Sequence, residues 1–242
     1  IEAYNGHDFS HYKTTTLKRR IAKRMLARGT PSPEVYDHLL EEETAEMDTL
    51  CRNLLIGVTR FFRDPEAFAI LEERIIPRLF AGKEDSDTIR VWTAGCSTGE
   101  EAYSLAILLK EHADKINSSV DIKLFATDLD PHAINVARTA RYPTAIVQDV
   151  SPERLESYFR LQDAFYVVDK NIRKMIVFSE HDILSDPPFY NIDLLSCRNL
   201  LIYLKPKVHA LLFSLFCHSL RTGGCLFLGS AESLGQSSNL FD

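Results

Sequence analysis

Short apolar runs alternate with helical stretches from about residue 88 onwards, and this alternation limits the possible folds more than any other feature of the sequence. The apolar or β-branched runs are residues 89–93, 122–127, 175–178, 193–196 and 225–228. The helical stretches between them are residues 100–112, 131–139 and 207–220. Strands that alternate with helices predict a parallel sheet with helices on both faces. We therefore expect an α/β fold with a doubly wound, Rossmann-like sheet.

One segment interrupts this rhythm. Residues 164–168 and 172–178 are apolar and flank the polar triplet Asp169–Lys170–Asn171, a pattern typical of a hairpin. We expect a small antiparallel β-subdomain with a helix, inserted at about residues 143–178.

The first third of the chain has the periodicity of helices. Leu17, Ile21 and Met25 recur every fourth residue, between an N-cap region at residues 14–16 and a stop at Gly29. This spacing predicts a first helix with basic residues on its other faces.

Further helices and a domain boundary follow this first helix. A second helix is expected over residues 33–50, and a third over residues 66–80 after the start signal Asp64–Pro65. The polar run 82–87 then predicts a boundary between an N-terminal helical domain with its linker, residues 1–82, and the sheet domain, residues 83–242.

Composition places the chain among ordinary globular proteins, with 45% hydrophobic and 26% charged residues in a length of 242. No apolar run reaches the roughly 18 residues of a membrane helix, and no signal segment opens the chain. The five cysteines are scattered, which is typical of a reducing compartment, and no Cys/His cluster has zinc-site spacing. We expect a soluble, cytoplasmic protein that enters no membrane and binds no metal.

Charge is distributed unevenly along the chain. The formal net charge of −6 argues against nucleic acid as a partner. Residues 1–30, however, hold seven Lys or Arg against the two acids Glu2 and Asp8, whereas residues 31–50 hold seven acids and no Lys or Arg. Such segregation indicates a binding surface. The alternative is a solvated helix face that the neighbouring acidic segment neutralises.

The strongest local signal is the sequence VWTAGCSTGEE at residues 91–101. A strand ends in a loop of small residues and a helix begins at Glu100–Glu101, so that backbone N–H groups are open to a ligand. The loop matches neither G-x-x-x-x-G-K-[ST] nor G-x-G-x-x-G. The two acids favour a ligand that is cationic or presents hydroxyl groups, and a tight turn with acids favoured by the helix dipole is the alternative.

Two further strands end in polar residues. One runs into Asp128, where nucleotide-type α/β folds place an acid that binds ribose hydroxyls, and Asp130 is the expected N-cap of the next helix. The other runs into the pair Arg198–Asn199 and then Tyr203, for which packing is the alternative to a functional role. Since ligands bind beyond the carboxyl ends of parallel strands, the residue 91–101 loop and Asp128 fall on one edge of the sheet.

These motifs, taken together and in this order, resemble the CheR family of chemotaxis receptor glutamate methyltransferases, class I enzymes that use S-adenosyl-L-methionine (SAM). The resemblance covers nearly the whole chain and rests on residues 6–10, 59–65, 94–104, 126–130, 197–203 and 229–233. Residues 55–59 and 186–189 look most like the methyltransferase domain of fused methylesterase–methyltransferase (CheB/CheR) proteins. The chain is therefore expected to be part of a longer one, with the other domains as partners.

The resemblance implies residue roles at the matching positions. Contacts to SAM, or to its product S-adenosyl-L-homocysteine (SAH), are implied for Thr59, Arg63, Gly95, Glu100 or Glu101, Asp128, Asp182, Ile183, Asn199 and Leu200. The pattern leaves both glutamates open, with Glu101 favoured. Arg63 and Tyr203 would act as catalytic residues near the transferred methyl group. The chain departs from the family at Gly57, where single-domain members often have Asn, and at Asp182, which replaces an Asn.

The implied activity is methyl transfer from SAM to glutamate side chains of a chemoreceptor-like protein. Glutamate has a reference pKa of about 4.3 and is already an anion at neutral pH, so no Ser-His-Asp or Cys-His arrangement is expected. Arg19, Arg20, Lys23 and Arg24 would dock onto glutamate-rich receptor helices. The alternative is a non-catalytic SAM- or SAH-binding regulatory module, and a nicotinamide-dependent dehydrogenase is disfavoured by the missing G-x-G-x-x-G.

Overall fold

The computed structural model describes Tyr4 and residues 6–241, so that Glu2 of the basic segment lies outside the described residues, as do Ile1, Ala3, Asn5 and Asp242. The chain divides into two compact units. The smaller unit contains residues 1–56 and 200–211, and the larger contains residues 57–199 and 212–242. None of the helices in the described part of the chain is long and apolar enough to cross a membrane.

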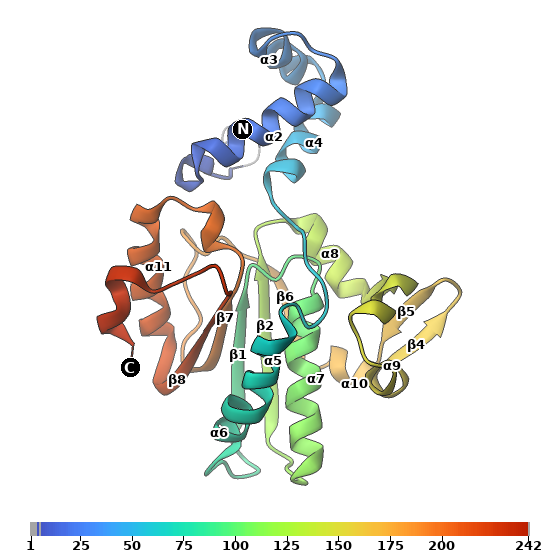
Figure 1. The fold of residues 1–242 in the computed structure, drawn as a ribbon, viewed down its shortest axis with the longest axis vertical. Helices are drawn as coiled ribbons and strands as arrows, with labels where there is room; N and C mark the ends of the chain where they lie inside the picture. Colours follow the sequence, from blue (N-terminus) through green and yellow to red (C-terminus); the bar gives the residue numbers. More distant parts are fainter. Residues whose placement is uncertain (1–3, 5, 242) are drawn as a thin grey trace. The chain divides into compact units, whose positions relative to one another are not determined.

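The smaller unit is helical (Figure 1). Its elements are η1 (Phe9–His11), α2 (Thr14–Arg28), α3 (Pro33–Glu42), α4 (Thr44–Leu54), η4 (Leu201–Tyr203) and the first part of α11 (Pro206–Ser219). The predicted first helix is confirmed and ends at Gly29, whose φ of 66° is left-handed. Lys13, rather than residues 14–16, occupies its N-cap. The single helix expected over residues 33–50 is wrong, because extended backbone at Glu43 separates α3 from α4.

A partly buried ion pair joins α2 to α4. Arg24 Nη2 lies 2.5 Å from Glu46 Oε2, and Arg24 Nε lies 2.9 Å from Oε1. The Tyr36 hydroxyl of α3 donates to the same carboxylate at 2.8 Å, so that one acid links three helices. Burial, together with this bond, raises the pKa of Tyr36 to about 12. Burial alone would raise the pKa of Glu46, but the bonds from Arg24 and Tyr36 lower it below its ordinary value.

The larger unit is built on a five-stranded sheet (Figure 1). Its strands are β1 (Thr88–Ala94), β2 (Asp121–Asp128), β6 (Ile176–Glu180), β7 (Ile192–Cys197) and β8 (Leu220–Leu228). Their spatial order is β6-β2-β1-β7-β8, and every pairing is parallel. The predicted parallel sheet is therefore confirmed, and the strand order reverses between β1 and β7.

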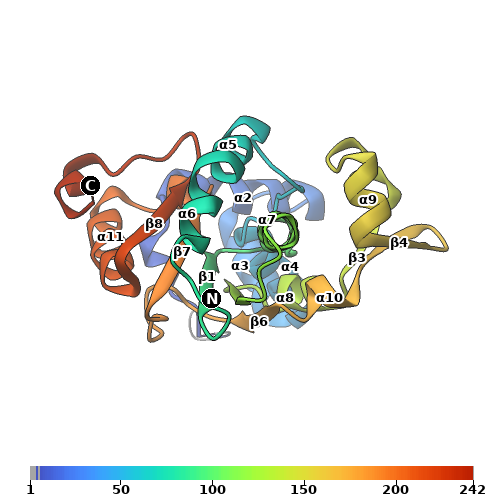
Figure 2. The same cartoon turned by 90° about the horizontal axis from the view of Figure 1, so that it is seen from below.

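Helices cover both faces of this sheet (Figure 2). α7 (Glu100–Lys115) and α11 lie on opposite sides, and α8 (Pro131–Thr139) follows β2. Successive side chains of β1 point to opposite faces of the sheet. Ile89 and Val91 belong to the hydrophobic core that contains α7, whereas the centre of the Trp92 ring lies 6.3 Å from that of Phe216 in α11. The doubly wound fold follows from these two apolar faces.

The inserted subdomain is an antiparallel sheet, and of the two runs expected to form it, residues 164–168 supply a strand whereas residues 172–178 do not belong to it. The order is β3-β5-β4, with β3 (Arg141–Pro143), β4 (Phe159–Gln162) and β5 (Phe165–Val168), and η3 (Thr144–Gln148) and α9 (Pro152–Tyr158) come between β3 and β4. The hairpin predicted around residues 169–171 is wrong. The Asp169 carboxylate accepts from the Asn171 N–H and caps the short helix α10 (Lys170–Arg173). The next apolar run becomes β6 of the main sheet.

Residues 57–82 pack with the larger unit, which differs from the division expected at residue 82. α5 (Pro65–Ile70), η2 (Leu71–Ile75) and α6 (Ile76–Phe80) form one helical run. In this run η2 is a π-turn, placed just before Pro77, which has no N–H to donate. Phe61, Phe68 and Leu79 are buried in the core around the main sheet, so this apolar segment belongs to the sheet domain.

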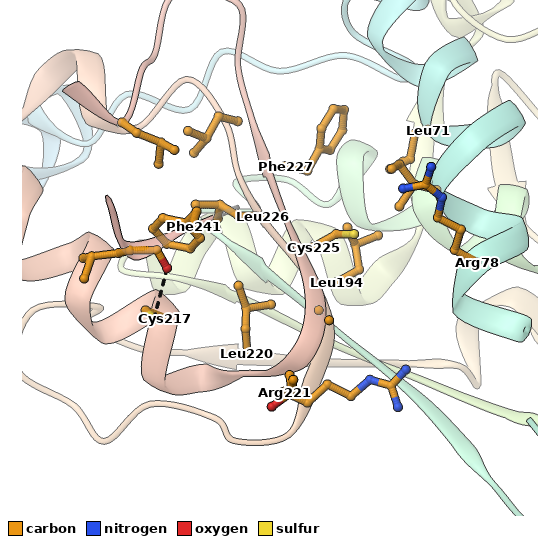
Figure 3. A pocket seen from close by; sticks show the side chains of 17 residues that line it. Leu71, Arg78, Leu194, Cys217, Leu220, Arg221, Cys225, Leu226, Phe227 and Phe241 are labelled. Atoms are coloured by element: carbon orange, nitrogen blue, oxygen red, sulfur yellow. Dashed lines mark hydrogen bonds between the residues drawn. The ribbon is translucent and has the colours of Figure 1, made fainter. Parts of the chain in front are cut away.

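A pocket of about 730 Å³ lies along β8, which pairs only with β7 among the described strands (Figure 3). Apolar side chains such as Leu71 and Phe227 line it, together with Arg78 and Arg221. None of the residues predicted to contact the cofactor lines this pocket.

Replacing Glu46 with Gln is expected to destabilise the smaller unit by about 2 kcal/mol, because the partly buried Arg24 would lose its charged partner. The difference in unfolding free energy between the two proteins should be largest near neutral pH. It should shrink as the pH falls through the lowered pKa of Glu46, because the unmodified protein then loses the same negative charge. Denaturant unfolding followed by circular dichroism measures it, while the fluorescence of Trp92, the single tryptophan, follows the larger unit.

The matched control is Glu43→Gln, which removes the more exposed pair with Arg28 and should cost no more than about 0.5 kcal/mol. Equal losses in the two variants would contradict the importance of the buried pair.

Candidate functional site

The loop between β1 and α7 is held in an unusual shape at the carboxyl edge of the sheet. Gly95, Ser97 and Gly99 have left-handed φ angles of 74°, 50° and 95°. Gly99 admits no side chain, because a Cβ there would lie 2.8 Å from a side chain of α8. The N–H groups of Gly95 and Cys96 both donate to the Thr127 carbonyl at 2.8 Å, which ties the loop to the end of β2.

Asp128 ends β2 directly beside this loop. Its Oδ2 accepts from the Ser97 N–H at 2.7 Å and its Oδ1 accepts from the Asp130 N–H at 2.9 Å. Burial raises the pKa of Asp128, although the backbone N–H bonds oppose the shift. Each carboxylate oxygen can accept a further hydrogen bond, so Asp128 retains the capacity to bind hydroxyl groups. The predicted cap is confirmed, because Asp130 accepts from an N–H in the first turn of α8.

The end of β6 lies next to Asp128. The His181 N–H donates to the Asp128 carbonyl at 3.0 Å, and the partly buried Asp182 and Ile183 follow directly. The Asp182 carboxylate accepts from the Leu184 N–H at 2.9 Å and so shapes the turn that begins there.

Thr59 and Arg63 lie in the segment before α5, and both are partly buried. Arg63 Nη1 donates to the Val58 carbonyl at 3.1 Å. The Phe62 N–H donates to the Ser104 hydroxyl of α7 at 3.0 Å. These bonds fix the segment against the helix that follows the β1–α7 loop.

The two candidate glutamates have different partners. Glu101 accepts from the Ser196 hydroxyl at 2.7 Å and from Arg198 Nη1 at 3.2 Å. Glu100 accepts from the Thr98 hydroxyl at 2.6 Å. Burial raises the pKa of both glutamates, and the shift of Glu101 is opposed chiefly by Arg198. A cation of the chain therefore holds Glu101, whereas a loop hydroxyl holds Glu100.

Arg198 has a structural role that the sequence analysis missed. Its side chain has no exposed area, and its Nη2 donates to Asp64 Oδ2 at 2.8 Å and to the Arg63 carbonyl at 2.9 Å. The rings of Phe68 and Phe227 lie 5.2 and 4.6 Å from its guanidinium carbon. Asp64 occupies the N-cap of α5 before Pro65, as expected, but with a φ of 61° its side chain makes no cap bond and pairs with Arg198 instead. The sequence did contain a signal for this role, because Arg198 directly follows an apolar strand and a buried charge requires buried partners.

Leu200 and Tyr203 belong to the smaller unit, whereas the other residues predicted to bind the cofactor or to act in catalysis belong to the larger. Leu200 is the N-cap of η4, and the carbonyl of Tyr203 accepts from the Lys13 N–H at 2.9 Å. Asn199, the last residue of the larger unit's segment, donates its N–H to Glu232 at 2.8 Å.

The four basic residues expected to dock a partner have different environments. Arg24 is bound to Glu46, and Arg20 Nη1 donates to the Asn53 carbonyl at 2.7 Å. Arg19 and Lys23 are exposed. Part of the basic helix is thus neutralised by the acidic segment, as the alternative supposed, and Arg19 and Lys23 are the exposed members of the set.

The carboxyl edge of the sheet therefore suits a ligand with hydroxyl groups and a cationic group. The loop at Gly95 allows close approach to the backbone, Asp128 can accept from hydroxyls, and Glu100, bound by a loop hydroxyl, can add negative charge. This edge includes the β1–β7 position, where reversal of strand order creates a ligand crevice in open α/β sheets. The residues fit SAM, which carries a ribose and positive charge, better than a phosphate.

Two family models match the chain. The family model for the CheR methyltransferase SAM binding domain matches residues 57–242, and that for the CheR methyltransferase all-alpha domain matches residues 1–55. The chain is 34% identical over 235 residues to a chemotaxis protein methyltransferase of Listeria innocua, covering 95% of this chain and 85% of that protein. It is 30% identical over 244 residues to one of Borreliella burgdorferi, covering 97% and 86%.

A further relative is much longer. The chain is 42% identical over 229 residues to an uncharacterized 104.1 kDa protein of Rhodobacter capsulatus, covering 95% of this chain and 24% of that protein. A solved SAM-dependent methyltransferase from Geobacter sulfurreducens, in complex with SAH, aligns with 14% identity and a TM-score of 0.38, covering 70% of this chain and 49% of that chain. That likeness is too distant to bear on function.

The larger unit is thus a SAM-binding domain, and SAM is its cofactor. The smaller unit carries the all-alpha domain that accompanies it. With both domain models matched and curated relatives aligned along most of their length, the chain belongs to the CheR methyltransferase family.

Proposed function

We propose that the protein transfers the methyl group of SAM to glutamate side-chain carboxylates of a chemoreceptor-like signalling protein. The observation that carries this proposal is the Asp128 carboxylate, held beside the β1–α7 loop at the carboxyl edge of a CheR-family sheet. The Listeria and Borreliella relatives are chemotaxis protein methyltransferases, which supports a substrate in that signalling system.

The cofactor is held, on this proposal, by residues at the ends of four strands and in the segment before α5. Asp128 accepts from the ribose hydroxyls, and Glu100 or Glu101 faces the positively charged end of the molecule. The remaining contacts are assigned to Thr59, Arg63, Gly95, Asp182, Ile183, Asn199 and Leu200. SAM supplies an activated methyl group, so the chain has to bind and orient the two reactants.

The acceptor needs no general base. A glutamate side chain is an anion at neutral pH, and proximity and orientation can lower the barrier by up to roughly 7–11 kcal/mol. The Arg63 guanidinium, with its fork of donors, would orient a carboxylate. Tyr203 would align the acceptor through a hydrogen bond, since a reference pKa of about 10 makes its phenol a poor base at neutral pH.

Docking of the substrate protein is assigned to the exposed positive charge of α2. Arg19 and Lys23 are four positions apart in the sequence and therefore lie on one side of that helix. A glutamate-rich receptor helix would be attracted to them, and electrostatic steering of this kind weakens as salt is added.

The compartment and the wider protein are also proposals. All five cysteines are free thiols, which supports a reducing location such as the cytoplasm. The 104.1 kDa relative supports further domains of one fused chain as partners.

Asp128→Ala is expected to weaken SAH binding about 10- to 100-fold, because it removes a charged acceptor for the ribose hydroxyls. Isothermal titration calorimetry measures the affinity. Asp130→Asn is the control, since Asn also serves as an N-cap, and it should leave binding unchanged. Undiminished binding by Asp128→Ala would contradict the assigned site, and absence of SAH binding by the unmodified protein would contradict the proposed function.

Tyr203→Phe is expected to lower kcat for receptor methylation at least about tenfold while SAH affinity stays within about twofold, because the phenol orients only the acceptor. Incorporation of base-labile methyl groups into receptor fragments measures turnover. No incorporation by the unmodified protein, with SAH still bound, would favour the non-catalytic regulatory module.

Arg19→Glu/Lys23→Glu is expected to raise KM for the receptor fragment about tenfold at low salt, and the difference should shrink as salt screens the charges. Arg74→Glu/Lys115→Glu makes the same change of charge at exposed positions of the larger unit and serves as control. Equal effects of the two double variants would show that net charge, rather than α2, attracts the substrate.

A further inference from the structure

Ser97 lies in the β1–α7 loop, between two segments assigned to the cofactor. Its backbone N–H donates to Asp128 Oδ2 at 2.7 Å. On its other side, a Cβ built on Gly57 would lie 3.0 Å from the Ser97 hydroxyl oxygen. The backbone of Ser97 therefore contacts the end of β2, and its hydroxyl lies close to the start of the segment that carries Thr59.

The Ser97 hydroxyl is buried without a hydrogen-bond partner among the described residues. The residue is only 7% exposed, so bulk solvent is not available to satisfy this group. Buried hydroxyls are nearly always paired, and an unpaired one costs about 1–3 kcal/mol in desolvation. A ligand bound beside this hydroxyl could supply the missing hydrogen-bond partner.

The backbone conformation of Ser97 also indicates a ligand-binding position. Its φ of 50° lies in the left-handed region, which is uncommon for a residue with a side chain. The bond from its N–H to Asp128 holds Ser97 in this conformation, in which the hydroxyl lies next to Gly57. Strained backbone of this kind gathers at ligand-binding positions.

We propose that the Ser97 hydroxyl is a cofactor contact that hydrogen-bonds a ribose hydroxyl of SAM beside the Asp128 carboxylate. The proposal rests on the proposed cofactor site and adds a binding residue to it. Because Gly57 has no side chain, no group at that position competes for the Ser97 hydroxyl.

The test compares Ser97→Ala with the unmodified protein by calorimetry, using SAH and 5′-methylthioadenosine, which keeps the ribose and lacks the amino-acid part. Loss of one neutral hydrogen bond is expected to weaken binding of both ligands about 5- to 10-fold. Thermal stability without ligand should stay the same or rise, because the variant removes an unsatisfied group.

Ser219→Ala is the matched control. Ser219 is also buried, but its hydroxyl already donates to the Leu215 carbonyl within α11, so its removal should leave both affinities unchanged.

Gly57→Ala gives a second, independent readout. The added Cβ crowds the Ser97 hydroxyl at 3.0 Å and should weaken SAH binding, and this loss should largely disappear in the Ser97→Ala background. Independent losses in the double variant would contradict the geometry proposed here.

Unchanged SAH affinity in Ser97→Ala would overturn this inference and leave the proposed function standing. A loss confined to SAH, with 5′-methylthioadenosine unaffected, would overturn the assignment to the ribose. Failure of the unmodified protein to bind SAH would overturn the proposed function itself.

Discussion

The buried guanidinium of Arg198 is the interaction on which the arrangement of the larger unit depends. It follows β7 directly and pairs with Asp64, before α5, and with Glu101, in α7. Removing one partner of such a buried pair costs about 3–5 kcal/mol. The pairing therefore stabilises the packing of the segments that carry Asp64, Glu101 and Arg198 against one another. Arg198 also donates to the Arg63 carbonyl. This one side chain therefore positions both Glu101 and Arg63, which are assigned to the cofactor.

The inserted subdomain supports the cofactor loop from its other end. Tyr142 of β3 donates its hydroxyl to the Thr98 carbonyl at 2.7 Å, and its ring packs edge-on against Phe61 at 4.8 Å. Burial raises the pKa of Tyr142 well above its ordinary value, which keeps the phenol protonated as a donor. The small antiparallel sheet is therefore coupled both to the loop after β1 and to the segment that carries Thr59 and Arg63.

Local signals predicted much of the fold, and they failed where residues far apart in sequence decided the outcome. The helix over residues 131–139, its cap at Asp130 and the stop at Gly29 follow from short-range chemistry, and the structure has all three. Asp169 and Asp64 carry the same kind of signal with different outcomes. Asp169 caps a helix where a hairpin was expected. Asp64 stands at the N-cap of α5 as expected, but its side chain binds an arginine more than a hundred residues away instead of the helix N–H groups.

By itself the sequence determined the alternation of strands and helices, the acids at the strand ends and the family resemblance, because these depend on residue type and order along the chain. Tertiary structure alone decided that Glu101 is bound by Arg198, that Arg24 is paired with Glu46, and that the Ser97 hydroxyl is unpaired beside Gly57. The physical reason is burial: whether a polar group is satisfied depends on which distant groups surround it, and no local pattern records that.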